Sequence, residues 1–313
     1  MEAMQITNDT KNAQTVTDLP TLRRVIIDDL FKDFNGSRRW VRSLLEPVAR
    51  LPIHRFARVM ASLDQIVASG GFREAMHEAV KIFTKTMRQI GCKHVPQRGP
   101  LLIVSNHPGV CDSMVIAASL PRDDLKIIAF GFPLLRHLPN ASRHLIFTDY
   151  ARAQASNMSV VRTVIRHLHS GGSVLIFPSG RIEPDPAVMP GAVDSLRRWS
   201  PSIELILRKV PQTKVQFTVV SGVLSPKFLR HPLIKLLSGS RDPQAIAETL
   251  QTLTQMIFAG WVRLKPTISF GIPKTVDELR QRNETLHQAM IAEAGQLLAT
   301  HIPGNGSYPV GDC

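Results

Sequence analysis

The stretch LLIVSNHPGVCDS, residues 101–113, joins a short apolar run to a tight turn and the start of a helix. The run LLIVS is typical of a buried β-strand. Pro108 and Gly109 indicate a turn directly after it, because proline fixes a turn-compatible φ and glycine adds backbone freedom. The segment CDSMVIAASL, residues 111–120, then favours a helix. A strand that feeds a helix through a turn is one unit of an α/β fold.

The same alternation of strand-like and helix-like segments continues toward the carboxyl terminus. Four further β-rich runs are predicted as strands, at residues 125–130, 173–178, 214–220 and 266–271. Helical patterns follow at residues 157–170, 243–260 and 276–300. This alternation predicts an α/β domain over residues 95–300, with a central mixed, largely parallel sheet flanked by helices.

The segment before this domain, residues 20–94, is predicted to form an N-terminal helical layer. Apolar side chains recur at intervals of three and four, as in Phe56, Val59, Met60 and Leu63, which is typical of amphipathic helices. We read four helices there, at residues 21–34, 38–51, 53–69 and 72–90. Residues 1–19 are expected to be a disordered tail and residues 301–313 a flexible one.

The composition is that of a globular protein with an unusual charge balance. Of the 313 residues 43% are hydrophobic and 20% charged, and the net charge is +13, which favours anionic partners such as a membrane surface, nucleic acid or acidic substrates. Three cysteines cannot form a disulfide framework, so we expect a reducing compartment. There is no signal-like apolar segment and no run of about 18 apolar residues. We therefore expect a cytoplasmic protein that associates peripherally with a membrane.

Two polar residues of the opening stretch, His107 and Asp112, are not needed by a turn. Five positions apart across a turn into a helix, the Asp112 carboxylate can contact one ring nitrogen of His107, which leaves the other nitrogen to act as a base. No G-x-S-x-G nucleophile motif accompanies them, so the hydroxyl to be activated would belong to a substrate. Taken alone, the residues leave a second interpretation open, in which His107 is a turn residue and Asp112 caps the helix.

A second loop, in SVLIFPSGRIEP at residues 173–184, follows another predicted strand. Its Phe-Pro-Ser-Gly-Arg sequence lies about 70 residues after Asn106-His107. Together the two loops resemble the glycerolipid acyltransferases of the 1-acylglycerol-3-phosphate acyltransferase (PlsC-like) superfamily, whose motifs are Asn-His-x4-Asp and Phe-Pro-Glu-Gly-Thr-Arg. The resemblance covers roughly residues 95–225. The chain departs from it at Ser179, where most members have Glu, and the arginine comes one position early.

The resemblance implies a function and a set of site residues. His107 would be the general base, oriented by Asp112, and would activate a hydroxyl of a glycerol-phosphate-type or lysophospholipid acceptor. That hydroxyl would attack the thioester of acyl-CoA or acyl carrier protein, with no cofactor and no metal site. The expected substrate-binding residues are Asn106, Arg136, Arg143, Phe177, Pro178, Ser179, Gly180 and Arg181. The second motif block of the family leaves the choice between Arg136 and Arg143 open.

Several residues keep two interpretations. Arg181 suits an acceptor phosphate, because its planar fork can bind two oxygens, but it could instead pair with Glu183 or Asp185. Backbone N–H groups near Gly109 or Gly180 could stabilise an oxyanion. Cys111 is interpreted as a small buried filler rather than a nucleophile.

The basic segment 225–241, SPKFLRHPLIKLLSGSR, could lie in a membrane interface with its apolar side down. The alternative is an ordinary amphipathic surface helix interrupted at Pro232.

Two other function classes compete with acyl transfer. The departures in the second loop keep open a catalytically silent lipid-binding relative. The high pI of about 10.2 alone would also suit a nucleic-acid-binding protein. Against that class, the aromatic content is only 6%, no nucleic-acid motif is present and the basic residues are spread along the chain. We therefore expect no nucleic-acid partner.

Overall fold

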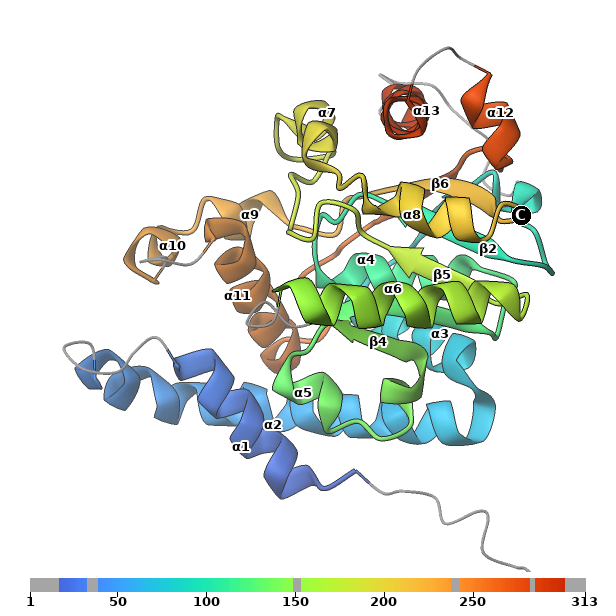
Figure 1. The fold of residues 1–313 in the computed structure, drawn as a ribbon. Helices are drawn as coiled ribbons and strands as arrows, with labels where there is room; N and C mark the ends of the chain where they lie inside the picture. Colours follow the sequence, from blue (N-terminus) through green and yellow to red (C-terminus); the bar gives the residue numbers. More distant parts are fainter. Residues whose placement is uncertain (1–16, 33–38, 149–152, 238–241, 282–284, 302–313) are drawn as a thin grey trace, which may run out of the picture.

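The computed structural model describes residues 17–32, 39–148, 153–237, 242–281 and 285–301 (Figure 1). The predicted tails, residues 1–19 and 301–313, lie almost entirely outside the described residues, and the division into a helical region and an α/β domain stays a prediction. No helix within the described ranges combines the length and the apolar character needed to cross a membrane.

The described residues form one seven-stranded sheet, and the predicted fold class is confirmed. The strand order is β1-β7-β6-β2-β5-β3-β4, with every neighbouring pair parallel except β6 and β7. The strands are β1 (Arg88–Ile90), β2 (Leu101–Ser105), β3 (Leu125–Phe130), β4 (Leu145–Thr148), β5 (Ser173–Ile176), β6 (Lys214–Ser221) and β7 (Thr267–Phe270).

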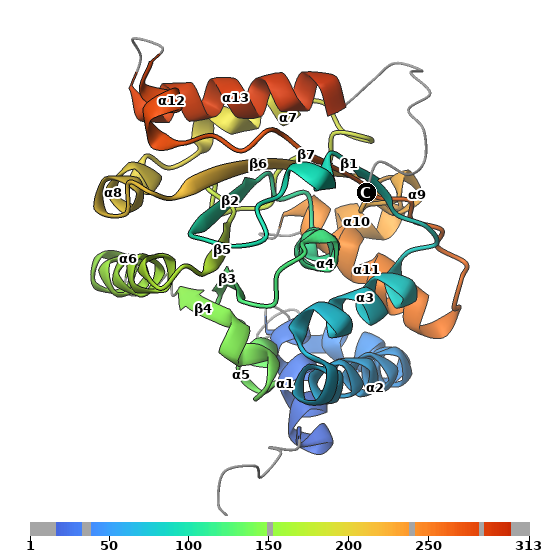
Figure 2. The same cartoon turned by 90° about the vertical axis from the view of Figure 1, so that its right-hand side faces the viewer.

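Strand β2, the apolar run of the opening stretch, lies in the middle of the sheet between β5 and β6. All five of its residues are buried, because helices cover both faces of the sheet. Leu101 and Ile103 belong to one core, and Leu102 and Val104 to the other. The first core contains α2 (Arg39–Gly70), α3 (Phe72–Phe83) and α4 (Val110–Ser119), and the second contains α6 (Ala153–His169), α8 (Ser202–Lys209) and α13 (Leu286–His301) (Figure 2).

The remaining helices are α1 and α11, which pack against α2, and several short ones. Helix α11 also contacts α9 and α10. Their bounds are α1 (Leu19–Phe31), α5 (Pro133–Arg136), α7 (Ala192–Ser195), α9 (Pro226–Leu229), α10 (Pro232–Leu237), α11 (Pro243–Ile257) and α12 (Val276–Arg280).

The N-terminal helices differ from the prediction in two places. The two helices read at residues 38–51 and 53–69 are one 32-residue helix, α2, which continues through Pro47 and Pro52. Its first half is held by packing of Val41, Leu45 and Ala49 in a small cluster with α1, and this packing offsets the hydrogen bonds that the two prolines cannot donate. The helix read at residues 72–90 ends at Phe83, because Arg88–Ile90 pairs with β7 as strand β1.

Two further elements differ toward the carboxyl terminus. Residues 145–148 form strand β4 at the edge of the sheet, which was not predicted. The helix read at residues 276–300 is divided into α12 and α13. A capping box between Thr275 and Glu278 starts the first of them.

The basic segment 225–241 follows the surface-helix interpretation over its described part. Helix α9 and helix α10 are separated before Pro232, as that interpretation expected. Phe228 and Ile234 are only 8% and 5% exposed and pack with Leu224 and Ile246 in a third core. The apolar surface of these two residues is therefore used within the protein, whereas Leu233 of the same segment is 39% exposed, so the membrane interpretation stays a prediction.

Candidate active site

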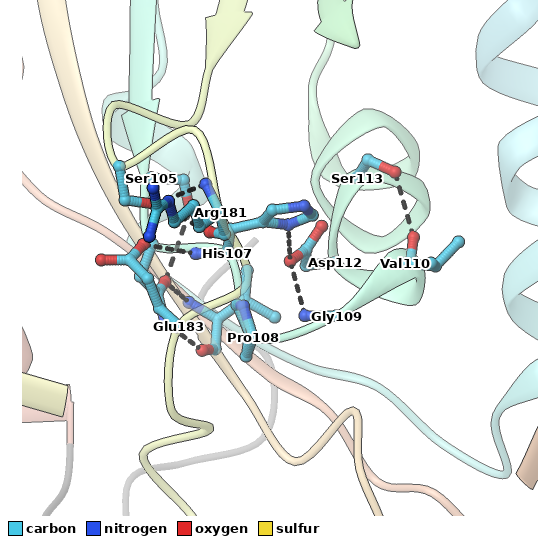
Figure 3. Close-up of polar contacts among 12 residues, drawn as sticks. Ser105, His107, Pro108, Gly109, Val110, Asp112, Ser113, Arg181 and Glu183 are labelled. Atoms are coloured by element: carbon cyan, nitrogen blue, oxygen red, sulfur yellow. Dashed lines mark hydrogen bonds and ion pairs between the residues drawn. The ribbon is translucent and has the colours of Figure 1, made fainter. Parts of the chain in front are cut away.

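His107 and Asp112 form a hydrogen-bonded pair at the carboxyl end of β2 (Figure 3). His107 Nδ1 lies 2.8 Å from Asp112 Oδ2, and the same oxygen accepts the Gly109 N–H at 3.1 Å. Asp112 is fully buried in the first turn of α4, whereas the His107 side chain is 25% exposed. Since Nδ1 donates its proton to Asp112, Nε2 is left as an acceptor with no protein partner among the described residues.

Asn106 fastens the loop that carries His107 to the neighbouring strand β6. Its Nδ2 donates to Val220 O at 2.9 Å, and its Oδ1 accepts the Val220 N–H at 2.8 Å. The side chain thus takes the place of one more residue pair in the sheet. This contact fixes the turn from which the His107 ring projects.

Glu183, in the second loop, holds the main chain of His107 from the other side. Its Oε2 accepts the His107 N–H at 2.9 Å, and its own N–H donates to His107 O at 2.7 Å. Its Oε1 accepts the indole N–H of Trp199 at 3.0 Å. Gln244 on α11 then joins the two loops, because its Nε2 donates to both Pro108 O and Glu183 O.

Another buried carboxyl group, that of Glu248 on α11, lies against the first turn of α4, close to the His107–Asp112 pair. Its Oε1 accepts the N–H of Val110, the first residue of that helix. The approach is close: a Cβ atom at position 109 would lie 2.6 Å from Glu248 Oε1, so a side chain there would displace the Glu248 carboxyl group. Burial raises the pKa of the Glu248 carboxyl to about 7, partly offset by the hydrogen bonds that it accepts from the backbone.

Three carboxyl groups set the electrostatics of His107. Burial by itself would lower the pKa of the imidazole, but the charge and hydrogen bond of Asp112, together with the charges of Glu248 and Glu183, hold the pKa above its ordinary value. Cys111 is buried between these carboxyl groups, and burial raises the pKa of its thiol, so that it stays protonated. This fits the interpretation of Cys111 as a filler.

The second loop places Phe177 directly against the histidine. The two rings stack with centroids 4.3 Å apart and planes 20° from parallel. Pro178 is buried, and its carbonyl accepts the Ser200 N–H. Phe177 therefore forms one wall of the site and fixes the plane of the imidazole.

The tip of the second loop is exposed and bonded mainly to itself. Ser179 Oγ donates to Arg181 O at 2.8 Å and accepts the Arg181 N–H at 3.3 Å. The Arg181 side chain is exposed and has no carboxylate partner among the described residues. Glu183 and Asp185, its two predicted partners, are occupied elsewhere: Asp185 accepts the N–H groups of Gly222, Val223 and Leu224.

The two glycines proposed for an oxyanion both have their N–H groups engaged. The Gly109 N–H donates to Asp112, and the Gly180 N–H donates to Phe177 O at 3.0 Å. Gly180 has φ +61, the left-handed conformation that bends the loop tip. An oxyanion role for either amide would thus require loss of an existing hydrogen bond.

The two candidate arginines of the second family block lie at opposite ends of the strands, one at the carboxyl ends and the other at the amino ends. Arg136 follows β3 on α5 and so lies at the carboxyl edge, where His107 also lies. Its guanidinium stands 4.6 Å from the Phe147 ring centroid. Arg143 precedes β4, which runs parallel to β3, and so lies at the amino edge. The structure therefore places Arg136, and not Arg143, at the carboxyl ends of the strands, where the His107–Asp112 pair also lies.

The comparisons with known proteins agree with this site. Residues 87–200, which include β1 to β5 and both loops, match the protein-family model described as Acyltransferase. The match to this model confirms the resemblance predicted from the two loops.

The crystal structure of the 1-acyl-sn-glycerophosphate (LPA) acyltransferase, PlsC, from Thermotoga maritima is similar with a TM-score of 0.42 and 15% sequence identity, over 91% of this chain and 95% of that one. No curated protein matches the sequence.

Three residues that build the site were not predicted for it from the sequence: Gln244, Glu248 and Trp199. The first two lie on α11, more than 130 residues from His107 along the chain. A signal existed, because Gln244, Glu248, Gln251 and Gln255 recur at helical spacing. In sequence such a row is typical of the solvent face of a helix, and here it is buried. No cluster of side chains suited to a metal ion occurs within the described ranges.

Proposed function

We propose that this acyltransferase moves a fatty acyl group from an acyl thioester to a hydroxyl of a glycerol-phosphate-type or lysophospholipid acceptor. The donor is acyl-CoA or acyl carrier protein, and no cofactor takes part. The observation that supports this proposal best is the 2.8 Å hydrogen bond between His107 Nδ1 and Asp112, which leaves Nε2 facing outward as a base.

The chemistry follows from that arrangement. His107 Nε2 takes the proton of the acceptor hydroxyl while the hydroxyl oxygen attacks the carbonyl carbon of the thioester. The tetrahedral intermediate collapses, the C–S bond breaks, and the thiolate takes the proton back from the imidazolium. Asp112 stabilises the imidazolium during this cycle. A base of this kind contributes about 10²–10⁴ to the rate.

The acceptor phosphate is assigned to the exposed tip of the second loop. The Arg181 guanidinium has no ion-pair partner among the described residues, and its fork can bind two phosphate oxygens. Ser179 holds the backbone of Arg181 in place. Arg136, at the same ends of the strands, is the second cation that we assign to the anionic substrate.

A thiol-release assay with a panel of acceptors tests this function. Wild-type protein is expected to release CoA from acyl-CoA, or the carrier thiol from acyl carrier protein, only when a suitable glycerophosphate or lysophospholipid is present. His107→Ala is expected to lose at least about 10²-fold of that activity. Binding of lipids without thiol release would show a catalytically silent relative. A salt-dependent shift with DNA but no thiol release would favour a nucleic-acid-binding protein.

The membrane partner of this enzyme is assigned to the outer side of α2 and its neighbours. Four large apolar side chains recur along the first half of α2 and are more than half exposed: Trp40 (66%), Leu44 (65%), Val48 (72%) and Leu51 (52%). The next turns carry Arg55 and Arg58, which line a cavity of about 740 Å³.

That cavity is lined by cationic and by apolar side chains. Its lining includes Arg55, Arg58, Lys81, Lys85 and Arg263 but no carboxylate. The aromatic pair Phe258 and Trp261, 58% and 65% exposed, lies in the same loop that supplies Arg263. Cations among exposed aromatic and aliphatic side chains suit the headgroup region of an anionic bilayer. We name this surface the α2 face, and we propose that it holds the protein peripherally on a cytoplasmic membrane surface.

Vesicle sedimentation tests the α2 face with two charge-matched variants. Arg58→Gln with Lys85→Gln removes two cations from the face, and Lys227→Gln with Arg230→Gln removes two from the basic segment 225–241. With vesicles rich in phosphatidylglycerol, the first variant is expected to bind about tenfold more weakly than the wild type and the second to bind like the wild type. The reverse order would assign the membrane to segment 225–241, and equal binding of all three would show that neither surface is responsible.

A further inference from the structure

Helix α11 carries a row of buried polar side chains that the proposed mechanism does not use. Gln244, Glu248, Gln251 and Gln255 are spaced four, three and four residues apart and are at most 6% exposed. Each bonds the main chain of another segment: Gln244 bonds Pro108 and Glu183, Gln251 bonds Val223 and Ser225, and Gln255 bonds Phe83. Glu248 is the member that bonds Val110, at the start of α4.

Glu248 differs from the other three members in chemistry rather than in geometry. All four side chains satisfy main-chain groups inside the protein, and three of them do so as neutral amides. A glutamine at position 248 could accept the Val110 N–H through its carbonyl oxygen without the cost of a buried ionisable group. A carboxyl group there costs desolvation, which is why its pKa is raised to about 7. The desolvation cost of a carboxyl group at this position suggests that the negative charge of Glu248 has a function.

The charged neighbours of Glu248 show where this charge acts. Asp112 and the N–H groups of Val110 and Cys111 face it from α4, and His107 faces it from the loop after β2. Glu183 acts on His107 from the second loop. The cations of the other packed elements lie elsewhere: Arg55 of α2 bonds the last turn of α11, at Met256 O and Ile257 O. Lys227 of α9 and Arg230, which directly follows that helix, are exposed.

We propose that Glu248 is a positioning residue of the His107–Asp112 pair, which fixes the first turn of α4 through Val110 and adds negative charge that stabilises the protonated imidazole. The proposal rests on the proposed function for its catalytic meaning. Asp112 orients the ring by direct contact, whereas Glu248 acts through α4 and through space. The base that removes the acceptor proton is then stronger than the His107–Asp112 pair alone would make it.

Proton occupancy of Glu248 links this effect to pH. Below about pH 7 the carboxyl group of Glu248 is protonated and adds no charge; above it the carboxylate forms and favours the imidazolium. The titrations of His107 and Glu248 are therefore coupled, and the wild-type imidazole is expected to titrate over a broadened range. Replacement of Glu248 by glutamine removes that coupling and leaves one simple step.

Nuclear magnetic resonance of the His107 ring tests the proposal without any substrate. The resonance is assigned by its loss in His107→Gln and is followed against pH in the wild type and in Glu248→Gln. The glutamine variant keeps an oxygen for the Val110 N–H, so the fold is preserved. Its imidazole is expected to titrate about one pH unit lower than in the wild type, because a nearby negative charge is gone. A midpoint within about 0.2 unit of the wild type would overturn the proposal.

Kinetics with the same variant give the second readout. In Glu248→Gln the acid limb of the kcat/KM profile is expected to move to lower pH. At the plateau kcat is expected to fall about threefold to tenfold, with KM changed by less than about twofold. Glu74→Gln, which removes an exposed carboxylate of α3, is the charge-matched control and should behave as the wild type.

A variant without an acceptor at position 248 separates charge from structure. Glu248→Leu removes both the negative charge and the oxygen that accepts the Val110 N–H. It is expected to lower the unfolding midpoint, whereas Glu248→Gln is not. If Glu248→Gln left both the pH profile and the imidazole titration unchanged, Glu248 would be only a helix cap and the proposal would be wrong. If His107 titrated lower in Glu248→Gln while the wild type released no thiol with any acceptor, the charge coupling would stand and the proposed function would fail.

Discussion

The loop of residues 106–112 and the loop tip of residues 179–181 lie at the same edge of the sheet but differ in how their polar groups are bound. In the first loop, Asn106, His107 Nδ1 and Asp112 all bond protein groups, and Asn106 and Asp112 are buried. At the loop tip, Ser179 bonds the main chain of Arg181 within the described part of the chain, and Arg181 is exposed.

Under the proposed function, this difference corresponds to two tasks of one site. A base must be held at a fixed angle and in one tautomer, so its loop is fastened by strand β6, helix α4 and Glu183. A group that binds a variable substrate gains from an exposed and adaptable side chain. The departures of the chain from the family motif, at Ser179 and Arg181, fall in the adaptable part. We therefore expect changes in the first loop to affect kcat and changes at the loop tip to affect KM.

The largest effect is expected for Asp112→Asn. Asparagine can keep an oxygen toward His107 and Gly109, since the other oxygen of Asp112 has no hydrogen-bond partner. The shape is then retained but the charge that stabilises the imidazolium is lost, so kcat should fall about 10²–10⁴-fold with little change in KM. Thiol-release kinetics measure this, and the double variant with His107→Ala should be no slower than His107→Ala. A rise in KM alone would contradict the role of Asp112.

A smaller and different effect is expected for Arg181→Gln. Loss of the guanidinium should raise KM for a phosphate-bearing acceptor about tenfold to hundredfold and leave kcat within about threefold. An acceptor alcohol of similar size without a phosphate is the control, and its kinetics should not change. Equal losses with both acceptors would show that Arg181 does not bind the phosphate.

The pair Arg136→Gln and Arg143→Gln compares the two edges of the sheet. Arg136 lies at the edge of His107 and Arg143 at the opposite edge. The first substitution is expected to raise the acceptor KM about threefold to tenfold, and the second to leave it unchanged. An effect of Arg143→Gln alone would mean that the substrate contacts the amino edge, which this arrangement does not predict.

The smallest effect is expected for Ser179→Ala. The hydroxyl contributes two hydrogen bonds to Arg181 in a half-exposed loop, and such bonds are worth about 1 kcal/mol or less. The acceptor KM should therefore rise no more than about fivefold, with kcat unchanged. A loss of kcat comparable to that of Asp112→Asn would make Ser179 part of the chemistry and would remove the distinction between the two loops.

Local patterns in the sequence were enough for most of the sheet. Strands β2, β3, β5, β6 and β7 are apolar runs bounded by turn residues, and all of them were predicted. Strand β1 was not, because its three residues continue the pattern of helix α3 and become a strand only by pairing with β7. Strand β4, the segment LIFT beside β3 at the sheet edge, was not predicted either, because its residues were considered only as part of the second motif block of the family.

The residues of the candidate site also divide into those that local motifs predict and those that only the packing of the fold brings in. Asn106, His107, Asp112 and Phe177 lie within two short motifs, and the structure brings them together. From the sequence, Glu183 is an alternative partner of Arg181, whereas in the structure its carboxylate holds the main chain of His107. The helical spacing of Gln244 and Glu248 did not mark them as site residues, because their partners are fixed by the packing of α11 and not by neighbours in the sequence.

The position of α11 near the carboxyl end of the chain has a consequence for the order in which the site can form. The family segment, residues 87–200, contains His107, Asp112 and both loops, but Val220, Gln244 and Glu248 lie beyond it. During synthesis the histidine is made long before the residues that hold it, and these contacts close loops of more than a hundred residues. The base should thus reach its working geometry only after most of the protein has been made, and a nascent chain that ends near residue 200 would carry the whole motif without a finished site.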